Sequence, residues 1–312
     1  MLSRRHAILT SGAFLALAAC GKRGGGASTL RVGSQKGGTK AVLLASGALD
    51  GAAYAVEWSD FPAAQNLLEA LGSDAVDVGL VGDAPFQFAY QSGSPVRAVA
   101  ALKAETRTPG ALAILVEARS PARSIRDLVG KRIATTRGSV GHFLVLRALE
   151  DARLASDAVK LIFLSPSDSR AALQTGAIDG WSTWVPYTAA ALAEGARIVV
   201  DGGAFSEGVA FDVASARAIR DKRHILADFL KREAKAFAWA NDHAEDYARI
   251  LAQETGLPFP IALTTVQLSA RQRVPLEQAL VEKQQKILDV FTRAGEFDAP
   301  RAIKGAFSPV QI

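Results

Sequence analysis

Four turns in this sequence have the composition of a binding site for a small anion. Each follows a short apolar run, precedes a helical pattern and contains small or polar residues, at 34–39, 82–85, 137–140 and 165–168. A helix start has free N–H donors and a partial positive charge, and glycine lets a ligand approach the backbone closely. A single such turn usually only caps its helix. Their recurrence predicts an anion receptor built from backbone dipoles and hydroxyls, without a buried cation.

The segments around these turns alternate between strand and helix patterns. Short apolar runs are each followed by a helical pattern, as in 76–81 before the helix that starts at 82–85, and in 132–135 before 140–153. This alternation predicts an α/β fold with mixed, mostly parallel sheets. Strand-to-helix turns of a parallel sheet share its carboxyl edge, where ligands bind. We therefore expect the four turns to lie near one another.

The pattern divides the chain into two α/β units and a helical segment. We expect lobe 1 to contain 29–116 plus 206–312 and lobe 2 to contain 117–205, with a ligand cleft between them. Beyond Ala218 the pattern is almost wholly helical, and we expect these helices to pack on lobe 1.

The first residues have the pattern of an export signal. Arg4 and Arg5 precede an apolar stretch that is too short to span a bilayer and ends at Cys20. This resembles a bacterial lipobox, so we expect a signal peptide at 1–19, a lipid on Cys20 and a flexible tether at 20–28. An ordinary signal peptide with a chance cysteine is the alternative. The arginine pair leaves open whether export uses the Sec or the twin-arginine route.

Composition excludes several function classes. The chain is 49% hydrophobic and 21% charged, as expected of a globular protein. Cys20 is the only cysteine, so the exported body has no thiol chemistry. The chain is only mildly basic once Arg4 and Arg5 are removed, which does not indicate nucleic-acid binding. The remaining histidines are far apart, so we expect no metal and no cofactor.

Several stretches together resemble the aliphatic sulfonate-binding proteins (SsuA-like) of ABC importers. They are RVGSQKGGTKAVLLASGAL, VEWSDFPAAQNLLEAL, DVGLVGDAPFQFAYQSG, RGSVGHFLVLRALEDARL, LSPSDSRAALQTGAIDGWSTWVPY and DGGAF. The resemblance runs from about Leu30 to Phe205 and implies a type II periplasmic binding protein, whose two lobes close on a ligand. Related binders of taurine, nitrate and thiamine precursors share this architecture, so the ligand is left open.

The resemblance also implies which residues contact the ligand. They are Gln35, Lys36, Gly37, Thr39, Gly82 and Asp83 in lobe 1, and Gly138, Ser139, His142, Trp184 and Tyr187 in lobe 2. Asp83 could instead cap a helix, and His142 could face the core or solvent. Trp184 would form an aromatic wall for an apolar tail. Val185 replaces the aspartate of the family's Trp-Asp-Pro-Tyr motif, which favours a plain organosulfonate or sulfate ester over an amino-sulfonate such as taurine.

These features favour a receptor over an enzyme. We expect a monomer, anchored in the periplasm through Cys20, that passes an organosulfonate to an ABC permease and its ATPase. Thiamine-precursor synthases and an aryl desulfinase resemble the same architecture, but the desulfinase type needs a cysteine nucleophile, which the exported body lacks. A sensor that uses the same cleft is a third hypothesis.

Overall fold

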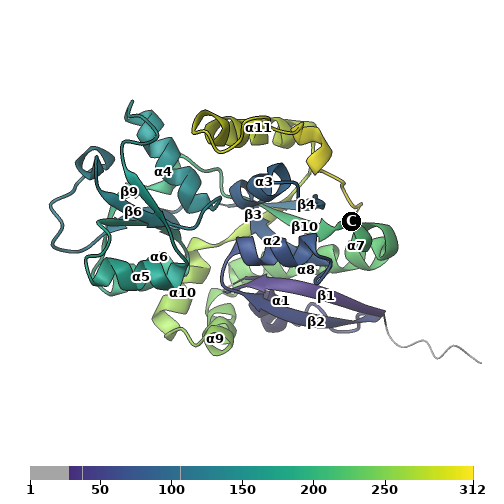
Figure 1. Ribbon diagram of the computed structural model, residues 1–312. Coiled ribbons are helices and arrows are strands. Elements are labelled where there is room, and N and C mark those ends of the chain that lie inside the picture. Colours follow the sequence, from purple (N-terminus) through teal and green to yellow (C-terminus); the bar gives the residue numbers. More distant parts are fainter. Residues whose placement is uncertain (1–27, 37, 106, 312) are drawn as a thin grey trace, which may run out of the picture.

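The computed structural model describes residues 28–36, 38–105 and 107–311. Two sheets, each flanked by helices, lie side by side in Figure 1. We refer to the six-stranded sheet and its helices as lobe 1 and to the five-stranded sheet and its helices as lobe 2. The expected signal peptide, Cys20 and Gly37 lie outside the described residues.

The sheet of lobe 1 has the strand order β11-β4-β10-β3-β1-β2. β1 pairs in parallel with β2 and β3, whereas β10 runs antiparallel to both β3 and β4. The strands are β1 (Ser28–Gln35), β2 (Tyr54–Phe61), β3 (Val78–Gly82), β4 (Val96–Ala104), β10 (Val209–Ser215) and β11 (Arg271–Val274). The expected mixed, mostly parallel arrangement is therefore interrupted by strands that return from the other lobe.

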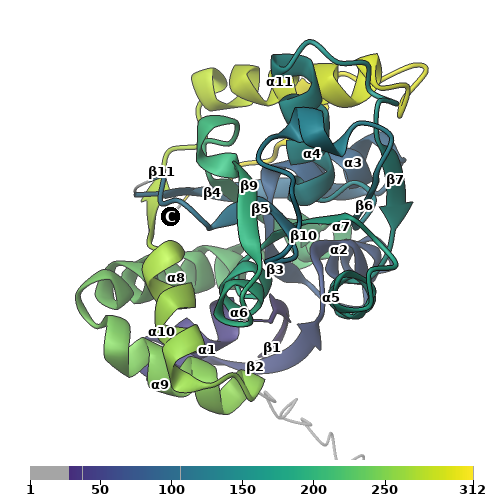
Figure 2. The same cartoon turned by 90° about the vertical axis from the view of Figure 1, so that its left-hand side faces the viewer.

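The sheet of lobe 2 has the order β7-β6-β8-β5-β9, with β7 and β9 at its edges (Figure 2). Its strands are β5 (Leu112–Val116), β6 (Arg132–Thr135), β7 (Lys160–Phe163), β8 (Gly180–Trp184) and β9 (Arg197–Asp201). β5 pairs antiparallel with β8 and β9, so the expected lobe boundary after residue 116 is wrong. The chain enters lobe 2 before β5, because a buried apolar strand carries no signal of which sheet it joins.

Helices cover both faces of the sheets. In lobe 1 and the C-terminal segment they are α1 (Thr39–Ser46), α2 (Ala64–Gly72), α3 (Asp83–Gln91), α7 (Ala216–Asp221), α8 (Arg223–Asp242), α9 (Ala244–Thr255), α10 (Phe259–Leu268) and α11 (Gln278–Arg293). In lobe 2 they are α4 (Val140–Asp151), α5 (Pro166–Gln174) and α6 (Tyr187–Ala193). Short 3₁₀ turns are η1 (Ile125–Leu128), η2 (Gly202–Ala204) and η3 (Ile303–Ala306).

The C-terminal helices join the two lobes. α8 and α9 pack on α1 in lobe 1, as expected, but α10 also contacts α6 of lobe 2. α11 lies across the top of Figure 1 and contacts both α3 and α4. The expectation that this segment packs on lobe 1 alone is therefore incomplete.

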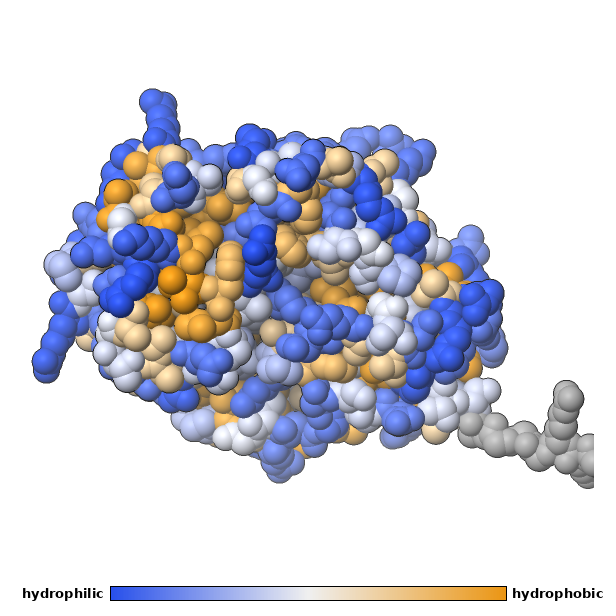
Figure 3. Space-filling view, in the orientation of Figure 1, coloured by the Kyte–Doolittle hydropathy of each residue, from blue (hydrophilic) through white to orange (hydrophobic). Residues whose placement is uncertain are grey.

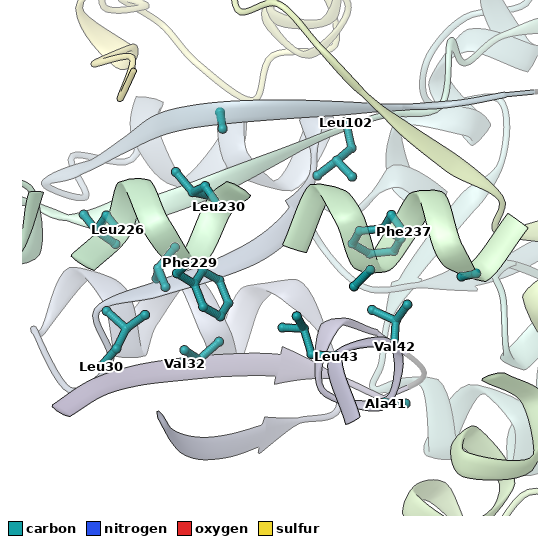
Figure 4. Close-up of a cluster of buried hydrophobic side chains, with 14 of the residues drawn as sticks. Leu30, Val32, Ala41, Val42, Leu43, Leu102, Leu226, Phe229, Leu230 and Phe237 are labelled. Carbon is teal, nitrogen blue, oxygen red and sulfur yellow. The ribbon is translucent and has the colours of Figure 1, made fainter. Parts of the chain in front are cut away.

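The larger core of lobe 1 lies between its sheet and α8. Figure 4 shows Phe229 of α8 directed toward Leu30 and Val32 of β1, while Phe237, further along α8, points toward Val42 of α1. Apolar residues recur along α8 at helical spacing, and this amphipathic pattern places them on the face that meets the sheet. Burying each such side chain contributes about 1.5–3 kcal/mol, so α8 fixes the position of α1.

The two lobes share one structural device at the edge opposite the cleft. Arg31 donates its backbone N–H to Asp77 Oδ2 at 2.8 Å, and Asp77 returns its N–H to Arg31 O. Arg132 and Asp179 repeat this exchange in lobe 2, with an N–H to Oδ2 distance of 2.9 Å. Each arginine also forms an ion pair with its aspartate. The repeat confirms the expectation of two α/β units of similar build.

Candidate functional site

The two lobes enclose a cavity of about 210 Å³, referred to here as the interlobe cavity. Lobe 1 lines it with the cleft ends of β1, β3, β4, β10 and β11 and with the start of α1. Lobe 2 lines it with the starts of β5 and α4, the end of β8 and the turn η2. The cavity is therefore at the sheet edges where the sequence predicted the anion-binding turns.

The turn between β1 and α1 gives the cavity its first helix start. Gln35, Lys36, Gly38 and Thr39 all line it, and Thr39 is almost fully buried. The Gln35 side chain donates to Leu80 O at 2.7 Å, which ties this turn to β3. The first N–H groups of α1 have no partner within the helix, so this end favours an anion.

The second helix start belongs to α4 of lobe 2. Ser139 is the N-cap of α4, and its Oγ accepts the His142 N–H at 3.1 Å. Its hydroxyl also lies 3.2 Å from Thr135 Oγ1, and both Ser139 and Val140 line the cavity. Ser139 therefore orients the start of α4 and presents a hydroxyl in the cavity wall.

Gly138 has a different place from the one expected. It does not line the interlobe cavity, and it has a φ of +68°. A Cβ atom at Gly138 would lie 2.5 Å from Cγ of Phe88 in α3. Glycine is therefore required because the turn touches lobe 1, and direct ligand contact is not needed to explain it.

His142 does not line the interlobe cavity, which departs from the expectation. It is fully buried against Phe163 and Phe291, and its Nδ1 accepts the Gly138 N–H at 3.2 Å. Burial lowers the pKa of His142 to about 4, and the positive charge of Arg137 adds to this shift. His142 is thus a neutral side chain that supports the turn, on the face of α4 covered by α11.

The aromatic residues of lobe 2 have separate roles. Trp184 and Val185 line the cavity, as expected for an apolar wall. Tyr187 packs edge-on against Trp184, with the ring centroids 6.0 Å apart, but does not line the cavity. Its hydroxyl donates to Pro62 O of lobe 1 at 2.7 Å. Tyr187 therefore joins the lobes.

Asp83 lines the cavity and is the first residue of α3, whose N-cap is Gly82, so the expected helix cap is not found at Asp83. Its Oδ1 accepts the Ala84 N–H at 2.8 Å, at the start of α3 beside the cavity-lining Gly82. Burial raises the pKa of Asp83 to about 7, even though the Ala84 N–H and the charge of Arg271 oppose the shift. This carboxyl is therefore partly protonated near neutral pH.

Several cavity residues were missed by the sequence analysis, and most come from the C-terminal segment. Phe237, Tyr247, Thr265 and Arg271 line the interlobe cavity. Arg271 begins β11, a strand that the sequence analysis did not predict. The alternation of Arg271, Gln272, Arg273 and Val274 could have indicated a strand with both arginines on one face. It also places a cation at the site, contrary to expectation.

Polar contacts hold the lobes together beside the cavity. Gln65 of α2 donates to Arg137 O at 3.2 Å, next to the bond from Tyr187 to Pro62. The Arg137 side chain also pairs with Glu296 at 2.8 Å, just beyond α11. The cleft is therefore bridged beside the turn that begins α4.

The described ranges contain neither a cluster of metal-binding side chains nor a helix suited to crossing a bilayer. No group of three or more His, Cys, Asp or Glu side chains among residues 28–36, 38–105 and 107–311 could hold a metal ion. Within the same described part of the chain, no helix has the length and apolar character needed to cross a bilayer.

A family model described as NMT1/THI5 like matches residues 56–246. This chain belongs to that family. It is 33% identical over 267 residues to an aliphatic sulfonates-binding protein of Escherichia coli (strain K12). The matched region covers 84% of this chain and 83% of that protein.

Solved structures agree with this relationship. The alkanesulfonate-binding protein SsuA from Xanthomonas axonopodis pv. citri, bound to MOPS, matches with a TM-score of 0.83 and 28% identity over 90% of this chain and 98% of that one. The periplasmic aliphatic sulphonate binding protein SsuA from Escherichia coli matches with a TM-score of 0.80 and 28% identity, and the match covers 91% of this chain and 94% of that one. The expected periplasmic binding protein fold is confirmed, and these relatives are named as binding proteins.

Proposed function

We propose that this protein captures an organosulfonate, such as an alkane- or arylsulfonate, in the interlobe cavity and delivers it to an ABC permease. One observation carries the proposal: the starts of α1 and α4, from opposite lobes, meet the same cavity. A sulfonate spreads one charge over three oxygens, which suits several N–H and hydroxyl donors on different sides. The names of the relatives point to the same ligand class.

The walls beside the helix starts suit an apolar tail. Trp184, Val185, Val140 and Leu80 line the cavity together with the polar groups. An indole next to aliphatic side chains provides apolar contact without fixing the shape of the ligand. Val185 stands where a carboxylate would attract an amine, so the lining supports an organosulfonate or sulfate ester over taurine.

The energies of these contacts are sufficient for binding. A partly buried helix start stabilises an anion by up to about 2 kcal/mol, and each hydrogen bond to a charged group adds about 1.5–3 kcal/mol. Two helix starts and the Ser139 and Thr39 hydroxyls can offset the cost of desolvation. The sum is compatible with a micromolar Kd, which corresponds to about −8 kcal/mol.

The proposal includes a non-catalytic role, export and anchoring. Cys20 is the only cysteine in the sequence, so a cysteine nucleophile is absent from the body of the protein. The stretch from Leu17 to Gly21 supports lipidation of Cys20 and attachment of a monomer to a membrane facing the periplasm. Cys20→Ala should then move the protein from the membrane fraction to the soluble fraction. Product formation from aryl sulfinates by the pure protein would contradict the non-catalytic role.

Calorimetry with a matched pair of serine variants tests the ligand class. Ser139 and Ser165 both cap helices, and Ser165 Oγ accepts the Asp168 N–H at 3.2 Å, but only Ser139 lines the cavity. We expect alkanesulfonates to bind the wild type, Ser139→Ala to weaken binding about tenfold, and Ser165→Ala to leave it unchanged. A response to nitrate or a pyrimidine, with none to any alkane- or arylsulfonate, would discard the proposal.

A further inference from the structure

The interlobe cavity has a second polar end, far from the start of α1. Arg271 lines it from β11, at the outer edge of the lobe 1 sheet. Three strand-to-strand steps separate β11 from β3, and four separate it from β1. At about 4.8 Å a step, the backbone at Arg271 lies roughly 14 Å from the turn that begins α3 and roughly 19 Å from the turn that begins α1. One small anionic group cannot occupy both ends.

The side chain of Arg271 is partly exposed and forms no ion pair with a protein carboxylate in the described part of the chain, unlike that of Arg273. No ion pair or hydrogen bond of its guanidinium is found within the described part of the chain, although Asp83 and Tyr247 act on it electrostatically. Arg273, two residues further along the same strand, contrasts with it, because it pairs with Asp212 at 2.5 Å and with Glu233 at 2.9 Å. The two cations share a face of β11, and only Arg273 is neutralised by protein carboxylates.

A partly exposed guanidinium that faces a ligand cavity without a paired carboxylate can form strong, charge-assisted hydrogen bonds with an anionic group of the ligand. The carboxyl of Asp83 does not take this place, because its Oδ1 already accepts the Ala84 N–H and no ion pair joins it to Arg271. Burial lowers the pKa of Arg271, although Tyr247 and Asp83 act in the opposite direction. Thr265 and Ser269 line the cavity near this end, and their hydroxyls donate to Ile261 O and Thr265 O. Arg271 is therefore the group at this end that is suited to an anion.

We infer that the ligand is a dianion: a sulfonate whose chain ends in a second anionic group, such as a carboxylate, which forms an ion pair with Arg271. This inference rests on the proposed function, since it assigns the sulfonate to the starts of α1 and α4. The second group lies beyond Trp184, at the end of the cavity formed by β11 and helices α8 to α10. A cavity of about 210 Å³ is smaller than those that hold drug-sized ligands, which suits a short linear dianion.

Calorimetry with paired ligands on the purified full chain tests the inference. The dianions are sulfoacetate, 3-sulfopropionate and 4-sulfobutyrate, and the monoanions are ethane-, propane- and butanesulfonate of matching spacer length. We expect the best dianion to bind the wild type at least tenfold more tightly than its matched monoanion, which equals about 1.4 kcal/mol. Arg271→Gln should abolish this preference, because it should weaken binding of the dianion at least tenfold more than binding of its matched alkanesulfonate. Arg119→Gln, at an exposed site outside the cavity, should change neither.

Each contrary result has a separate meaning. Equal binding of dianions and monoanions by the wild type overturns the inference and leaves the proposed function standing. Equal loss of both ligand types in Arg271→Gln also overturns it, because Arg271 would then hold the sulfonate itself. Failure of every sulfonate to bind the wild type contradicts the proposed function. Arg271→Lys covers the case in which the glutamine variant does not fold: a reduced but remaining preference for dianions supports the inference, and an unchanged preference opposes it.

Discussion

At the scale of single residues, Asp83 gives the site a pH dependence. Its carboxyl lines the cavity, and burial raises its pKa to about 7, while Arg271 and Glu207 are the charged side chains that act on it in opposite directions. A deprotonated Asp83 repels an anion in the cavity, whereas a protonated one does not. The affinity for an alkanesulfonate, which stays anionic throughout this range, should therefore rise several-fold as the pH falls from 8 to 6.

Asp83→Asn provides the control for this prediction. The side-chain oxygen of asparagine can still accept the Ala84 N–H, so this hydrogen bond is kept while the titrating group is removed. Its Kd, measured by calorimetry at pH 6, 7 and 8, should be nearly constant and close to the wild-type value at pH 6. A wild-type Kd that does not vary across this range would show that Asp83 is not felt by the ligand.

The pKa of His142 is lowered, whereas that of Asp83 is raised, and the shift at His142 makes the stability of the fold depend on pH. Folding lowers its pKa from the ordinary 6.5 to about 4, because the folded chain buries the neutral ring against Phe163 and Phe291. Its contribution to stability is fully present above pH 6.5 and is lost as the pH falls through 4. Between pH 7 and pH 5 the free energy of unfolding should fall by about 2 kcal/mol from this residue.

Urea unfolding of wild type and His142→Gln at the two pH values measures this contribution. Carboxylates that titrate between pH 7 and pH 5 are present in both proteins. The decrease in the free energy of unfolding over this range is therefore compared between wild type and His142→Gln, and the difference gives the contribution of His142. The fall should be smaller in His142→Gln by about 2 kcal/mol. Equal falls would mean that the imidazole can be protonated without leaving its buried position.

At the scale of the elements, Gly138 links the start of α4 to lobe 1. Gly138→Ala places a methyl group against Phe88, whereas Gly176 has a similar φ of +70° with no atom within 4 Å of a Cβ. Both alanine variants carry the backbone cost of a positive φ, about 1 kcal/mol. Only Gly138→Ala should also weaken ligand binding, by about tenfold or more, because it prevents the lobes from meeting in this arrangement.

The double variant Phe88→Ala with Gly138→Ala makes the test specific. Truncating Phe88 removes the atoms that the new methyl group would meet, so calorimetry should find binding closer to wild type than in Gly138→Ala alone. If Gly176→Ala weakens binding as much as Gly138→Ala does, backbone strain is the cause and the contact between lobes is not.

The sequence predicts part of this site, and the helices and strands that carry its residues explain which part. Alternating strands and helices with small residues at the turns predicted the edge where Gln35, Gly82 and Ser139 meet, because a parallel sheet brings such turns together. His142 and Gly138 belong to the right element, but α11 and α3 cover their side, and no pattern within α4 reports a partner so distant in the chain. Arg271 was missed because a short edge strand with charged alternation resembles a loop.

At the scale of the whole molecule, the two sheets exchange strands. β5 follows the strands of lobe 1 in the chain but pairs with β8 and β9, and β10 returns from lobe 2 to pair with β3 and β4. The orders β4-β10-β3-β1-β2 and β9-β5-β8-β6-β7 then correspond strand for strand. Both crossings therefore lie beside the cavity, and a change of angle between the lobes need not break either sheet.

The outer surface differs between the lobes. In the view of Figure 3, apolar side chains gather over lobe 2, while polar side chains cover most of the rest of this face. Phe163, at the end of the edge strand β7, is 39% exposed and lies beneath the guanidinium of Arg137, 5.3 Å from its ring centroid. Arg137 also pairs with Glu296, so Phe163 is linked through Arg137 to the contact between the lobes.

Tyr187 provides the sharpest test of how the lobes stay together around a ligand. Its hydroxyl is the donor to Pro62 O across the cleft, and burial raises its pKa to about 12, so it remains a donor at physiological pH. Tyr187→Phe removes only this hydrogen bond, worth about 0.5–1.5 kcal/mol, and should weaken binding about threefold to tenfold, mainly through faster dissociation. Tyr90→Phe removes a similar bond, to Ala302 O within lobe 1, and should leave the dissociation rate unchanged. Stopped-flow displacement of an alkanesulfonate measures both rates. Equal rates in Tyr187→Phe and wild type would show that the ligand and the remaining contacts between the lobes hold them together without this bond.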